Sequence, residues 1–307
     1  MSSLSLRIGT RGSPMALYQA RLVRDRLAAA HVELAAPEAM TMVPIRTTGD
    51  RVQDRLLAEI GGKGLFTKEI EAALLDRRID LAVHSLKDME TVLPDGLMIG
   101  CVLPRDDPRD ALVARGGVPL GELPAGARIG TASLRRTAQL LRQRPDLIIA
   151  PIRGNVGTRL AKLDAGEVDA LLLALCGLER LGQAAIASEI LTPDTMLPAV
   201  GQGALAVECR AGDARVLRLL VPLHDAPSAV CVTAERAMLA ALDGSCRTPI
   251  AGLATLSGDR ITLDALLLTP DGRQEFRGSG TAASGDAAAL GAEIGARLRR
   301  DAGPDFA

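Results

Sequence analysis

Four polar side chains that could do chemistry follow a short apolar run, Leu81–Val83. The run is typical of a buried strand, and His84, Ser85, Lys87 and Asp88 come directly after it. Ligands of open α/β sheets bind beyond such strand ends, so we expect a site here with Asp88 as its acid–base candidate. The alternative interpretation is that Lys87 and Asp88 are solvated loop charges and that His84 is structural.

A second candidate site is the start of a predicted helix that Ser133 caps. Arg135 and Arg136 fall in the first turn of this helix, where a positive charge opposes the helix dipole. An anionic ligand at the same helix start would resolve this conflict, so the pair predicts an anion site. The apolar spacing predicts that the buried face of the helix consists of Leu134, Ala138 and Leu141.

The N-terminal segment also predicts a strand that runs into a helix. Ser13 is the expected helix cap, followed by a proline, and the free backbone N–H groups at this helix start would face an anion beside Arg11. Further on, Gly61–Gly64 surrounds Lys63 with glycines, but the phosphate-loop pattern G-x-x-x-x-G-K-[ST] is absent. A mobile lid that carries Lys63, followed by a helix with Phe66 on its inner face, is the favoured interpretation.

The chain repeats this strand-and-helix pattern and then changes character. Arg128–Thr131 has the same sequence as Arg7–Thr10. Strand ends and helix starts in the second copy gather five arginines, Arg135, Arg136, Arg153, Arg159 and Arg180. After Pro222 the pattern predicts a helix, three strands and a closing helix. We therefore expect an α/β fold of two lobes with a ligand in the cleft between them, plus a small C-terminal α+β domain.

Composition argues against several classes of protein. The 307 residues carry a net charge of −1 and only 1% aromatic residues, which disfavours a nucleic-acid surface and a base-stacking platform. The longest apolar run, Ala170–Leu178, is shorter than the roughly 18 residues that a membrane span needs, and the N-terminus has no secretory apolar region. We expect a cytoplasmic protein with no nucleic-acid partner and no membrane.

Five scattered cysteines predict neither a disulfide framework nor a zinc site. Cys246 differs from the others because it lies in a Gly-rich turn beside Arg247, and a nearby cation favours a reactive thiolate. A papain-like hydrolase would need a partner histidine, and none of the three histidines stands in a pairing motif. A metal site built on His84 and Asp88 lacks a third ligand, so we predict no metal.

Five motifs follow one another along nearly the whole chain: His84–Asp88, Gly130–Arg136, Arg153–Arg159, Leu197–Gly203 and Gly244–Cys246. In this order they resemble the hydroxymethylbilane synthase family, also called the porphobilinogen deaminases. The resemblance implies a transferase of three domains, the first two similar to type II periplasmic binding proteins. It implies domain 1 at 1–103, completed by 200–221, domain 2 at 104–199 and domain 3 at 222–307.

The same resemblance implies a role for each matching residue. Asp88 would be the catalytic carboxylate, and Cys246 would carry a dipyrromethane cofactor through a thioether bond. The other residues implied to bind this cofactor are Lys87, Ser133, Arg135 and Arg136. The residues implied to bind substrate carboxylates are Arg11, Ser13, Arg153, Arg159 and Arg180. Lys63 and Phe66 would lie in a mobile loop.

The implied reaction joins four porphobilinogen molecules head to tail into the linear tetrapyrrole hydroxymethylbilane, a step of porphyrin and heme biosynthesis. Each molecule loses ammonia and is then attacked by the free α-carbon of the terminal pyrrole. Asp88 would stabilise the cationic pyrroles and move protons, and water would release the product. A monomer fits the family. Met89 and Glu90 depart from its pattern, and Glu90 adds a negative charge near Asp88.

A non-catalytic, two-lobed binding protein for a polycarboxylate small molecule is the alternative function. Two lobes rich in arginine would suit such a protein as well as an enzyme. Proteins of that kind usually need export, however, and this function gives Cys246 no role.

Overall fold

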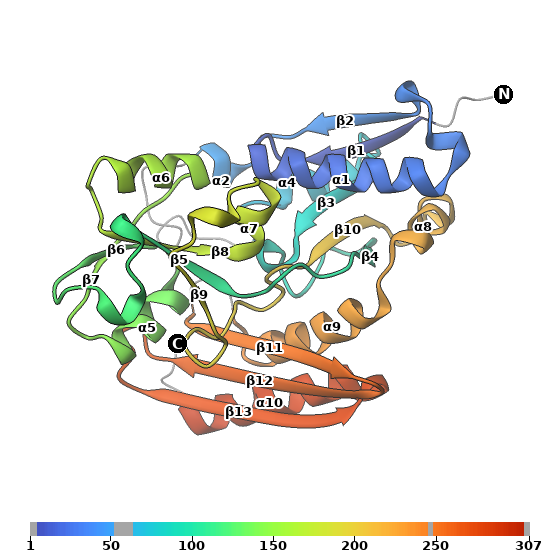
Figure 1. Ribbon diagram of the computed structural model, residues 1–307. Coiled ribbons are helices and arrows are strands. Elements are labelled where there is room, and N and C mark those ends of the chain that lie inside the picture. Colours follow the sequence, from blue (N-terminus) through green and yellow to red (C-terminus); the bar gives the residue numbers. More distant parts are fainter. Residues whose placement is uncertain (1–4, 52–63, 245–247, 304–307) are drawn as a thin grey trace. The chain divides into compact units, whose positions relative to one another are not determined.

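The computed structural model describes residues 5–51, 64–244 and 248–303 (Figure 1). Internal contacts divide the chain into two compact units. The first unit takes the described residues up to Arg105 together with Ala204–Ala229, and the second takes Asp106–Gly203 and the described residues from Val230 onward. The second unit therefore contains both the second predicted lobe and the C-terminal domain, and the division into three domains stays a prediction.

A five-stranded sheet in the order β2-β1-β3-β10-β4 forms the centre of the first unit. Its strands are β1 (Leu6–Thr10), β2 (Met40–Pro44), β3 (Leu81–Ser85), β4 (Leu97–Val102) and β10 (Leu205–Arg210). β1 runs parallel to β2 and β3, whereas β10 runs antiparallel to β3 and β4. β1, β3 and β10 are buried along almost their whole length, as expected for strands with both faces covered.

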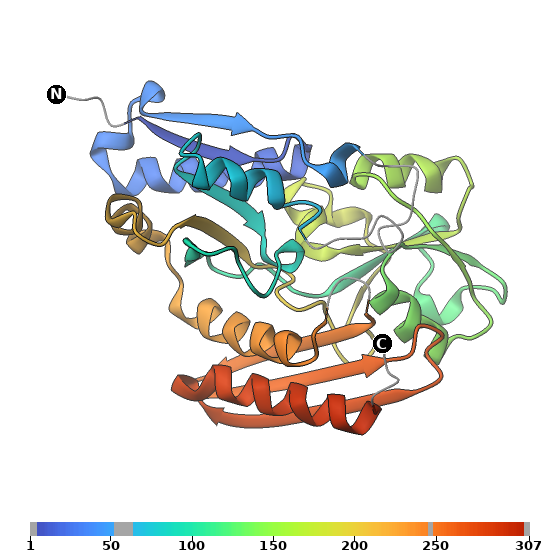
Figure 2. The same cartoon turned by 180° about the vertical axis from the view of Figure 1, so that it is seen from behind.

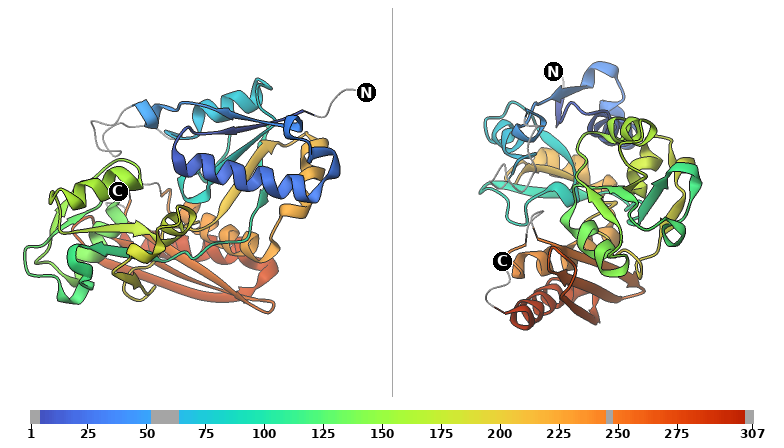
Figure 3. Two further views of the ribbon diagram at one scale, coloured as in Figure 1. Left: turned by 45° about the horizontal axis from the view of Figure 1, so that its top comes forward. Right: turned by 90° about the vertical axis from the view of Figure 1, so that its left-hand side faces the viewer.

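The helices of the first unit agree only in part with the predicted helix starts. The helices that lie wholly within the first unit are α1 (Pro14–Ala30), α2 (Thr48–Arg51), α4 (Lys68–Leu75) and α8 (Ala214–Leu220). Helix α1 lies against the strands of the first sheet (Figure 3, left). Ser13 caps it, because its Oγ accepts the backbone N–H of Ala16 at 3.2 Å. The prediction that Ser13 is the helix cap is confirmed.

Phe66 precedes helix α4 instead of lying on its inner face, so that part of the prediction is wrong. Gly64 takes a φ of 75° and opens a turn, and its carbonyl accepts the backbone N–H groups of Thr67 and Lys68 at 3.1 and 3.0 Å. The helix therefore begins at Lys68, two residues after Phe66, where the predicted apolar face starts.

The second unit contains a sheet with the same arrangement, in the order β7-β6-β8-β5-β9. Its strands are β5 (Asp110–Ala114), β6 (Arg128–Gly130), β7 (Ile148–Ala150), β8 (Ala170–Ala174) and β9 (Glu189–Leu191). β6 runs parallel to β7 and β8, and β5 runs antiparallel to β8 and β9. β6 thus takes the place that β1 has in the first sheet. The sequence repeat of Arg7–Thr10 and Arg128–Thr131 reflects this equivalence, and the two-lobed α/β prediction is confirmed.

Helix α5 buries Ala138 as predicted, but the rest of its buried face differs from the prediction. The helices beside the second sheet are α5 (Leu134–Gln143), α6 (Val156–Asp164) and α7 (Leu175–Arg180). In α5, Arg135 and Arg136 are only 5% and 6% exposed, whereas Leu134 and Leu141 are half-buried. The apolar pattern fails here because a buried carboxylate, described below, pairs with both guanidinium groups. Short 3-10 turns occur at Val32–Leu34, Pro37–Ala39, Leu86–Asp88 (η3), Arg115–Gly117, Leu120–Glu122, Ala184–Ile186, Val221–Leu223 and Ser284–Asp286.

An antiparallel sheet of β11 (Ile250–Ser257), β12 (Arg260–Leu268) and β13 (Glu275–Ala283) follows helix α9 (Ala226–Ala241). Helix α10 (Ala287–Ala302) covers one face of this sheet (Figure 2). Its buried residues Leu290, Ile294 and Leu298 follow the predicted helical spacing. The predicted C-terminal α+β fold is confirmed.

Asp80 cross-links strands of the first sheet and makes their stability depend on pH. Its carboxylate accepts hydrogen bonds from Arg7 at the backbone N (2.8 Å), Nε (3.1 Å) and Nη2 (2.9 Å), and Arg210 Nη2 lies 3.5 Å away. Burial raises the pKa of this carboxyl, but the hydrogen bonds from Arg7 and the charge of Arg210 outweigh burial and hold the pKa below its usual 3.8.

We expect Asp80→Asn to lower the free energy of unfolding by roughly 2 kcal/mol near neutral pH, because it removes the charge of a buried carboxylate that accepts hydrogen bonds from the partly exposed Arg7. The folded pKa lies below the unfolded one, so the contribution is complete above about pH 4 and is lost as pH falls through the folded value. Urea unfolding at about pH 6 and pH 3 should show the difference between wild type and variant shrinking with acid. Asp76→Asn, an exposed carboxylate, is the control, and an equal difference at both pH values would contradict the prediction.

Candidate functional site

The predicted catalytic carboxylate lies in the first unit, where β3 passes into the 3-10 turn η3 (Leu86–Asp88). Asp88 and Lys87 are exposed, and the turn beneath them is anchored by backbone hydrogen bonds. Leu86 N–H donates to the Ala204 carbonyl at 3.0 Å, and Met89 N–H donates to the Leu86 carbonyl at 3.1 Å. A rigid strand end therefore presents both charged side chains at the surface of the unit.

His84 is only 6% exposed and faces the interior of the first unit. Its Nε2 lies 3.0 Å from Oε2 of Glu208 on β10, and Glu208 is fully buried. Glu71 is also buried nearby, where burial and the Glu208 carboxylate raise the pKa of its own carboxyl. The neighbours of His84 are thus interior carboxylates, which supports the structural interpretation of this residue. Ser85 is likewise anchored, since Gln19 Nε2 donates to its Oγ at 2.9 Å.

Arg11 and Phe66, predicted at a substrate site and in a mobile loop, contact each other. The Arg11 guanidinium lies 4.2 Å from the centre of the Phe66 ring, a cation–π distance. Its other partner is Asp50, whose Oδ1 accepts from Arg11 Nε at 3.1 Å and also pairs with Nη2. Gly49 makes this arrangement possible, because a Cβ at that position would overlap the Phe66 ring. Arg11 is therefore held by a carboxylate of the protein itself, that of Asp50.

The conflict between Arg135, Arg136 and the helix dipole is resolved by Asp110 on β5, which is fully buried. Asp110 Oδ2 lies 2.7 Å from Arg135 Nη2, and Oδ1 accepts from Arg136 Nη2 and Nε at 2.7 and 3.2 Å. Ser133 caps the helix as predicted, accepting from the backbone N–H of Arg136 at 3.4 Å. The negative charge beside these arginines is thus supplied by the protein's own Asp110. The sequence argument from the helix dipole considered only an anionic ligand.

The remaining predicted arginines differ in burial. Arg180, at the end of α7, is only 8% exposed, and it donates from Nε to Asp106 Oδ2 at 2.8 Å and from Nη2 to the Gly203 carbonyl at 2.7 Å. Arg153 and Arg159 are half-buried around the start of α6, and Arg159 Nε donates to the Gly154 carbonyl at 2.9 Å. These three side chains belong to one lobe but have different surroundings.

The structure divides the predicted site between the two units. The first unit holds Arg11, Ser13, Phe66, Lys87 and Asp88. The second unit holds Ser133, Arg135, Arg136, Arg153, Arg159 and Arg180. Lys63 and Cys246 lie outside the described residues. Sequence reasoning gave no role to Asp50 or Asp110, although a charge directly before the apolar run Ala111–Ala114 was a usable signal for the latter.

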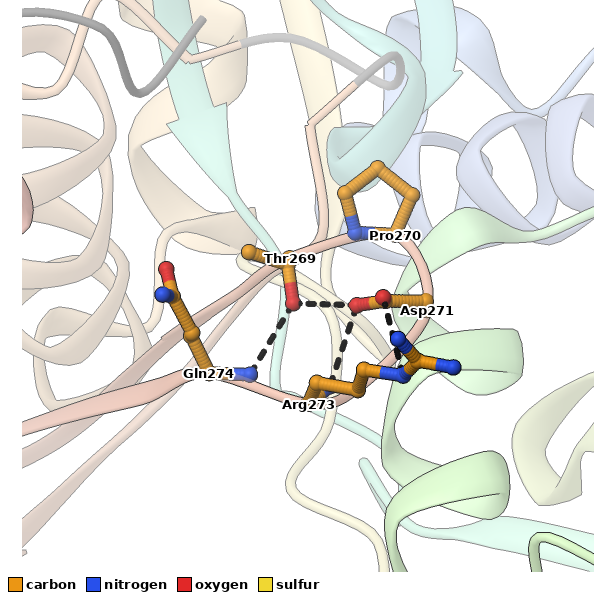
Figure 4. Close-up of a pocket in the computed structure, with 5 residues that line it drawn as sticks. All are labelled: Thr269, Pro270, Asp271, Arg273 and Gln274. Atoms are coloured by element: carbon orange, nitrogen blue, oxygen red, sulfur yellow. Dashed lines mark hydrogen bonds and ion pairs between the residues drawn. The ribbon is translucent and has the colours of Figure 1, made fainter.

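Other features of the described residues offer no competing site. A surface depression at the β12–β13 turn is lined by Thr269, Asp271, Arg273 and their neighbours, whose polar groups bond to each other (Figure 4). Among residues 5–51, 64–244 and 248–303, no group of three or more His, Cys, Asp or Glu side chains could hold a metal ion. In the same residues no single helix has the length and hydropathy of a membrane span. The two helical segments 214–223 and 226–241 have that length and hydropathy only when they are taken together, and a bend of 109° separates them.

Comparison with known proteins gives matches along nearly the whole chain. The family model described as "Porphobilinogen deaminase, dipyromethane cofactor binding domain" matches residues 6–218, and "Porphobilinogen deaminase, C-terminal domain" matches residues 229–300. The porphobilinogen deaminase of Paracoccus denitrificans is 55% identical over 98% of this chain and 96% of its own length. That of Nitrobacter hamburgensis is 54% identical over 97% of this chain and 94% of its own.

Among solved structures, a TRAP periplasmic solute binding protein from Desulfovibrio salexigens aligns with a TM-score of 0.44 and 11% identity over 73% of each chain.

The sequence matches confirm the resemblance predicted from the five motifs, and the first of the two family models spans both lobes. The chain therefore belongs to the porphobilinogen deaminase family and carries its dipyrromethane-cofactor-binding domain.

Proposed function

We propose that this protein is a hydroxymethylbilane synthase, which condenses four porphobilinogen molecules with loss of ammonia and releases the linear tetrapyrrole. One observation carries most of the weight. The chain is 55% identical to a porphobilinogen deaminase over 98% of its length, and its sequence has Asp88 and Cys246 within two of the five motifs that resemble the family. The family is one of transferases, and we assign this chain the same reaction.

The residues of the second unit fit a ligand with several carboxylates. Two guanidinium groups and one carboxylate, those of Arg135, Arg136 and Asp110, leave a formal charge of +1 in a buried place. Among the described residues, Arg135 Nε is buried and has no hydrogen-bond acceptor. A carboxylate of the dipyrromethane would supply both the missing charge and the missing acceptor.

In this proposal Ser133, Arg135 and Arg136 hold the cofactor carboxylates, Lys87 assists, and Cys246 provides the covalent thioether. When bound, the dipyrromethane supplies the free α-carbon on which the chain grows. Arg11, Ser13, Arg153, Arg159 and Arg180 bind substrate acetate and propionate groups. Arg11 is already paired with Asp50, so binding of a substrate carboxylate would replace that ion pair. The old and the new pair are both charge-assisted pairs of a guanidinium and a carboxylate.

Asp88 is the catalytic carboxylate of the proposed reaction. Positive charge develops on the pyrrole ring of porphobilinogen as ammonia leaves, and a carboxylate beside the ring stabilises that charge. The same oxygen atoms can take the proton that the attacking α-carbon loses after the new bond forms. The exposed position of Asp88 on an anchored turn suits both tasks, because the side chain can reach a ligand while its backbone stays fixed.

We also propose a monomeric, cytoplasmic enzyme with porphobilinogen as its substrate, no nucleic-acid partner and Lys63 and Phe66 in a lid. The net charge of −1 supports the lack of a nucleic-acid partner, since such partners call for a basic surface. The monomer, the compartment and the lid rest on the family resemblance.

The intact mass of the denatured protein tests the proposed function. Protein from cells that make porphobilinogen should carry an adduct of two porphobilinogen-derived units, because a thioether survives denaturation. Cys246→Ala should abolish the adduct, whereas Cys176→Ala, the same change at a buried cysteine, should keep it. An unmodified wild-type chain would contradict the enzyme and favour the polycarboxylate-binding protein.

A further inference from the structure

One motif of the sequence, Leu197–Gly203, has no role in the reaction described so far. Several hydrogen bonds hold its backbone: Leu197 N–H donates to Gln139 Oε1 at 2.8 Å, Gly201 N–H donates to Glu235 Oε2 at 2.7 Å, and Gly252 N–H donates to the Pro198 carbonyl at 3.0 Å. Gly201 and Gly203 have φ values of 70° and 88°, which favour glycine. The segment is therefore fixed in an unusual backbone path, and the contacts it makes explain that path.

Three groups of this segment reach the arginine sites of the second unit. The Leu197 carbonyl accepts from Arg135 Nη1 at 2.7 Å. Gln202, which is fully buried, donates from Nε2 to Asp110 Oδ1 at 2.9 Å and to the Pro108 carbonyl at 2.7 Å. The third group is the Gly203 carbonyl, which accepts a hydrogen bond from Arg180 Nη2 at 2.7 Å. One short segment thus contacts two of the predicted anion-binding arginines directly, and it also contacts Asp110, the carboxylate that pairs with Arg135 and Arg136.

The two adjacent arginines are held differently. Arg136 is fixed at three nitrogens, because Nε and Nη2 donate to Asp110 and Nη1 donates to the Leu172 carbonyl on β8 at 2.7 Å. Arg135 is fixed only at its two terminal nitrogens, by Asp110 and the Leu197 carbonyl. Its Nε is buried and has no acceptor among the described residues. All three side-chain nitrogens of Arg136 therefore have partners within the protein, whereas Arg135 keeps one buried donor for a ligand.

The charge of Asp110 explains why both arginines can be buried. A lone buried guanidinium is unfavourable, and two side by side also repel each other. Asp110 compensates one of the two charges, and the arginines hold the pKa of its carboxyl well below the usual range even though burial alone would raise it. The site therefore has a net charge of +1, and its guanidinium groups are already held in place before a ligand binds. Binding then costs less side-chain conformational entropy.

We propose that Asp110 and Gln202 are positioning residues for cofactor assembly, which orient Arg135 toward a carboxylate of the dipyrromethane. Gln202 fixes the Asp110 carboxylate, Asp110 fixes both guanidinium groups, and Arg135 makes the contact. This inference rests on the proposed function. It assigns the 197–203 motif to the binding of the cofactor carboxylate and not to the condensation chemistry.

The test follows adduct formation in the full chain, purified from cells that make no porphobilinogen and then given porphobilinogen at a series of concentrations. Intact mass measures the fraction of chains that gain the two-unit adduct with time. Asp110→Asn removes the charge but keeps the shape, and Gln202→Met removes the side-chain amide, including the donor to Asp110, but keeps a side chain of similar length. Asp146→Asn is the matched control, because Asp146 pairs with Arg144 in the same lobe, 2.7 Å away, and touches neither Arg135 nor Arg136. Circular dichroism verifies that each variant folds.

We expect Asp110→Asn to raise the porphobilinogen concentration for half-maximal assembly at least about tenfold, and Gln202→Met to raise it about threefold. The maximal rate should change little, and Asp146→Asn should match wild type. If Asp110→Asn does not fold, the shift in Gln202→Met decides. A fall in maximal rate at an unchanged half-maximal concentration, or variants identical to Asp146→Asn, would overturn the inference. A wild-type chain that gains no adduct would instead overturn the proposed function.

Discussion

Asp88→Asn should lower the rate of tetrapyrrole formation about 100-fold while the two-unit adduct on Cys246 still forms. The asparagine keeps the shape of the side chain but removes the charge that the proposal places beside the cationic pyrrole. Loss of one preorganised electrostatic contact typically lowers a turnover rate by a factor of about 100 to 1000. The effect should fall on the rate at saturating porphobilinogen, because the charge acts on a species that develops during the reaction and not on bound substrate.

The measurement is the initial rate of product release by protein whose intact mass shows the adduct. Asp95→Asn is the control, since Asp95 is an exposed carboxylate in the same unit and the substitution changes the net charge equally. Asp88→Asn with intact adduct and near-normal turnover would refute the role of Asp88. A variant that lacks the adduct would show that Asp88 acts already in assembly, and its turnover would then be measured after assembly at high porphobilinogen.

Gly291→Ala should destabilise the second unit by about 3 kcal/mol, although it adds only one methyl group. Helix α10 approaches helix α9 so closely at this point that a Cβ on Gly291 would overlap the backbone carbonyl oxygen of Ala234. Gly295 makes a similar approach to the Met238 carbonyl one turn later. Because the obstacle is backbone and not the end of a flexible side chain, the helices must move apart, and the packing of Leu290 and Ile294 is disturbed.

Urea unfolding followed by circular dichroism gives the change in stability. Gly285→Ala is the matched control, because a Cβ there meets nothing within 4 Å, and its φ is compatible with alanine. The control should stay within about 0.5 kcal/mol of wild type. Equal midpoints for Gly291→Ala and Gly285→Ala would show that α9 and α10 can separate without loss.

Local signals in the sequence predicted the helix starts and the strands that carry the site. Ser13 and Ser133 both cap helices because each is followed by residues whose backbone N–H groups need an acceptor. The apolar run at Leu81–Val83 became β3, and the spacing of Leu290, Ile294 and Leu298 became the buried face of α10. These features depend on neighbours within a few residues, so a single sequence contains the information.

The partners of the charged residues could not be predicted in the same way. Asp110 lies 25 and 26 positions before the arginines it compensates, and Gln202 follows it by 92 positions. Helical periodicity assigned Leu134, Ala138 and Leu141 to the buried face and left out Arg135 and Arg136, because it counts only apolar residues. A compensating carboxylate from another strand reverses that assignment, and nothing in the local sequence marks which carboxylate it is. The family resemblance predicted the site residues but not what holds them in place.

The position of strand β10 has a consequence for the nascent chain. β10 lies between β3 and β4 in the first sheet, yet the whole of 106–203 separates β4 from β10 along the sequence. Until Arg210 has left the ribosome, β3 and β4 lack their shared neighbour, whereas all five strands of the second sheet have already been made. Pairing over such a separation is also slow. The second sheet should therefore complete its strand pairing before the first sheet does. This is the reverse of the usual N-to-C order of domain folding.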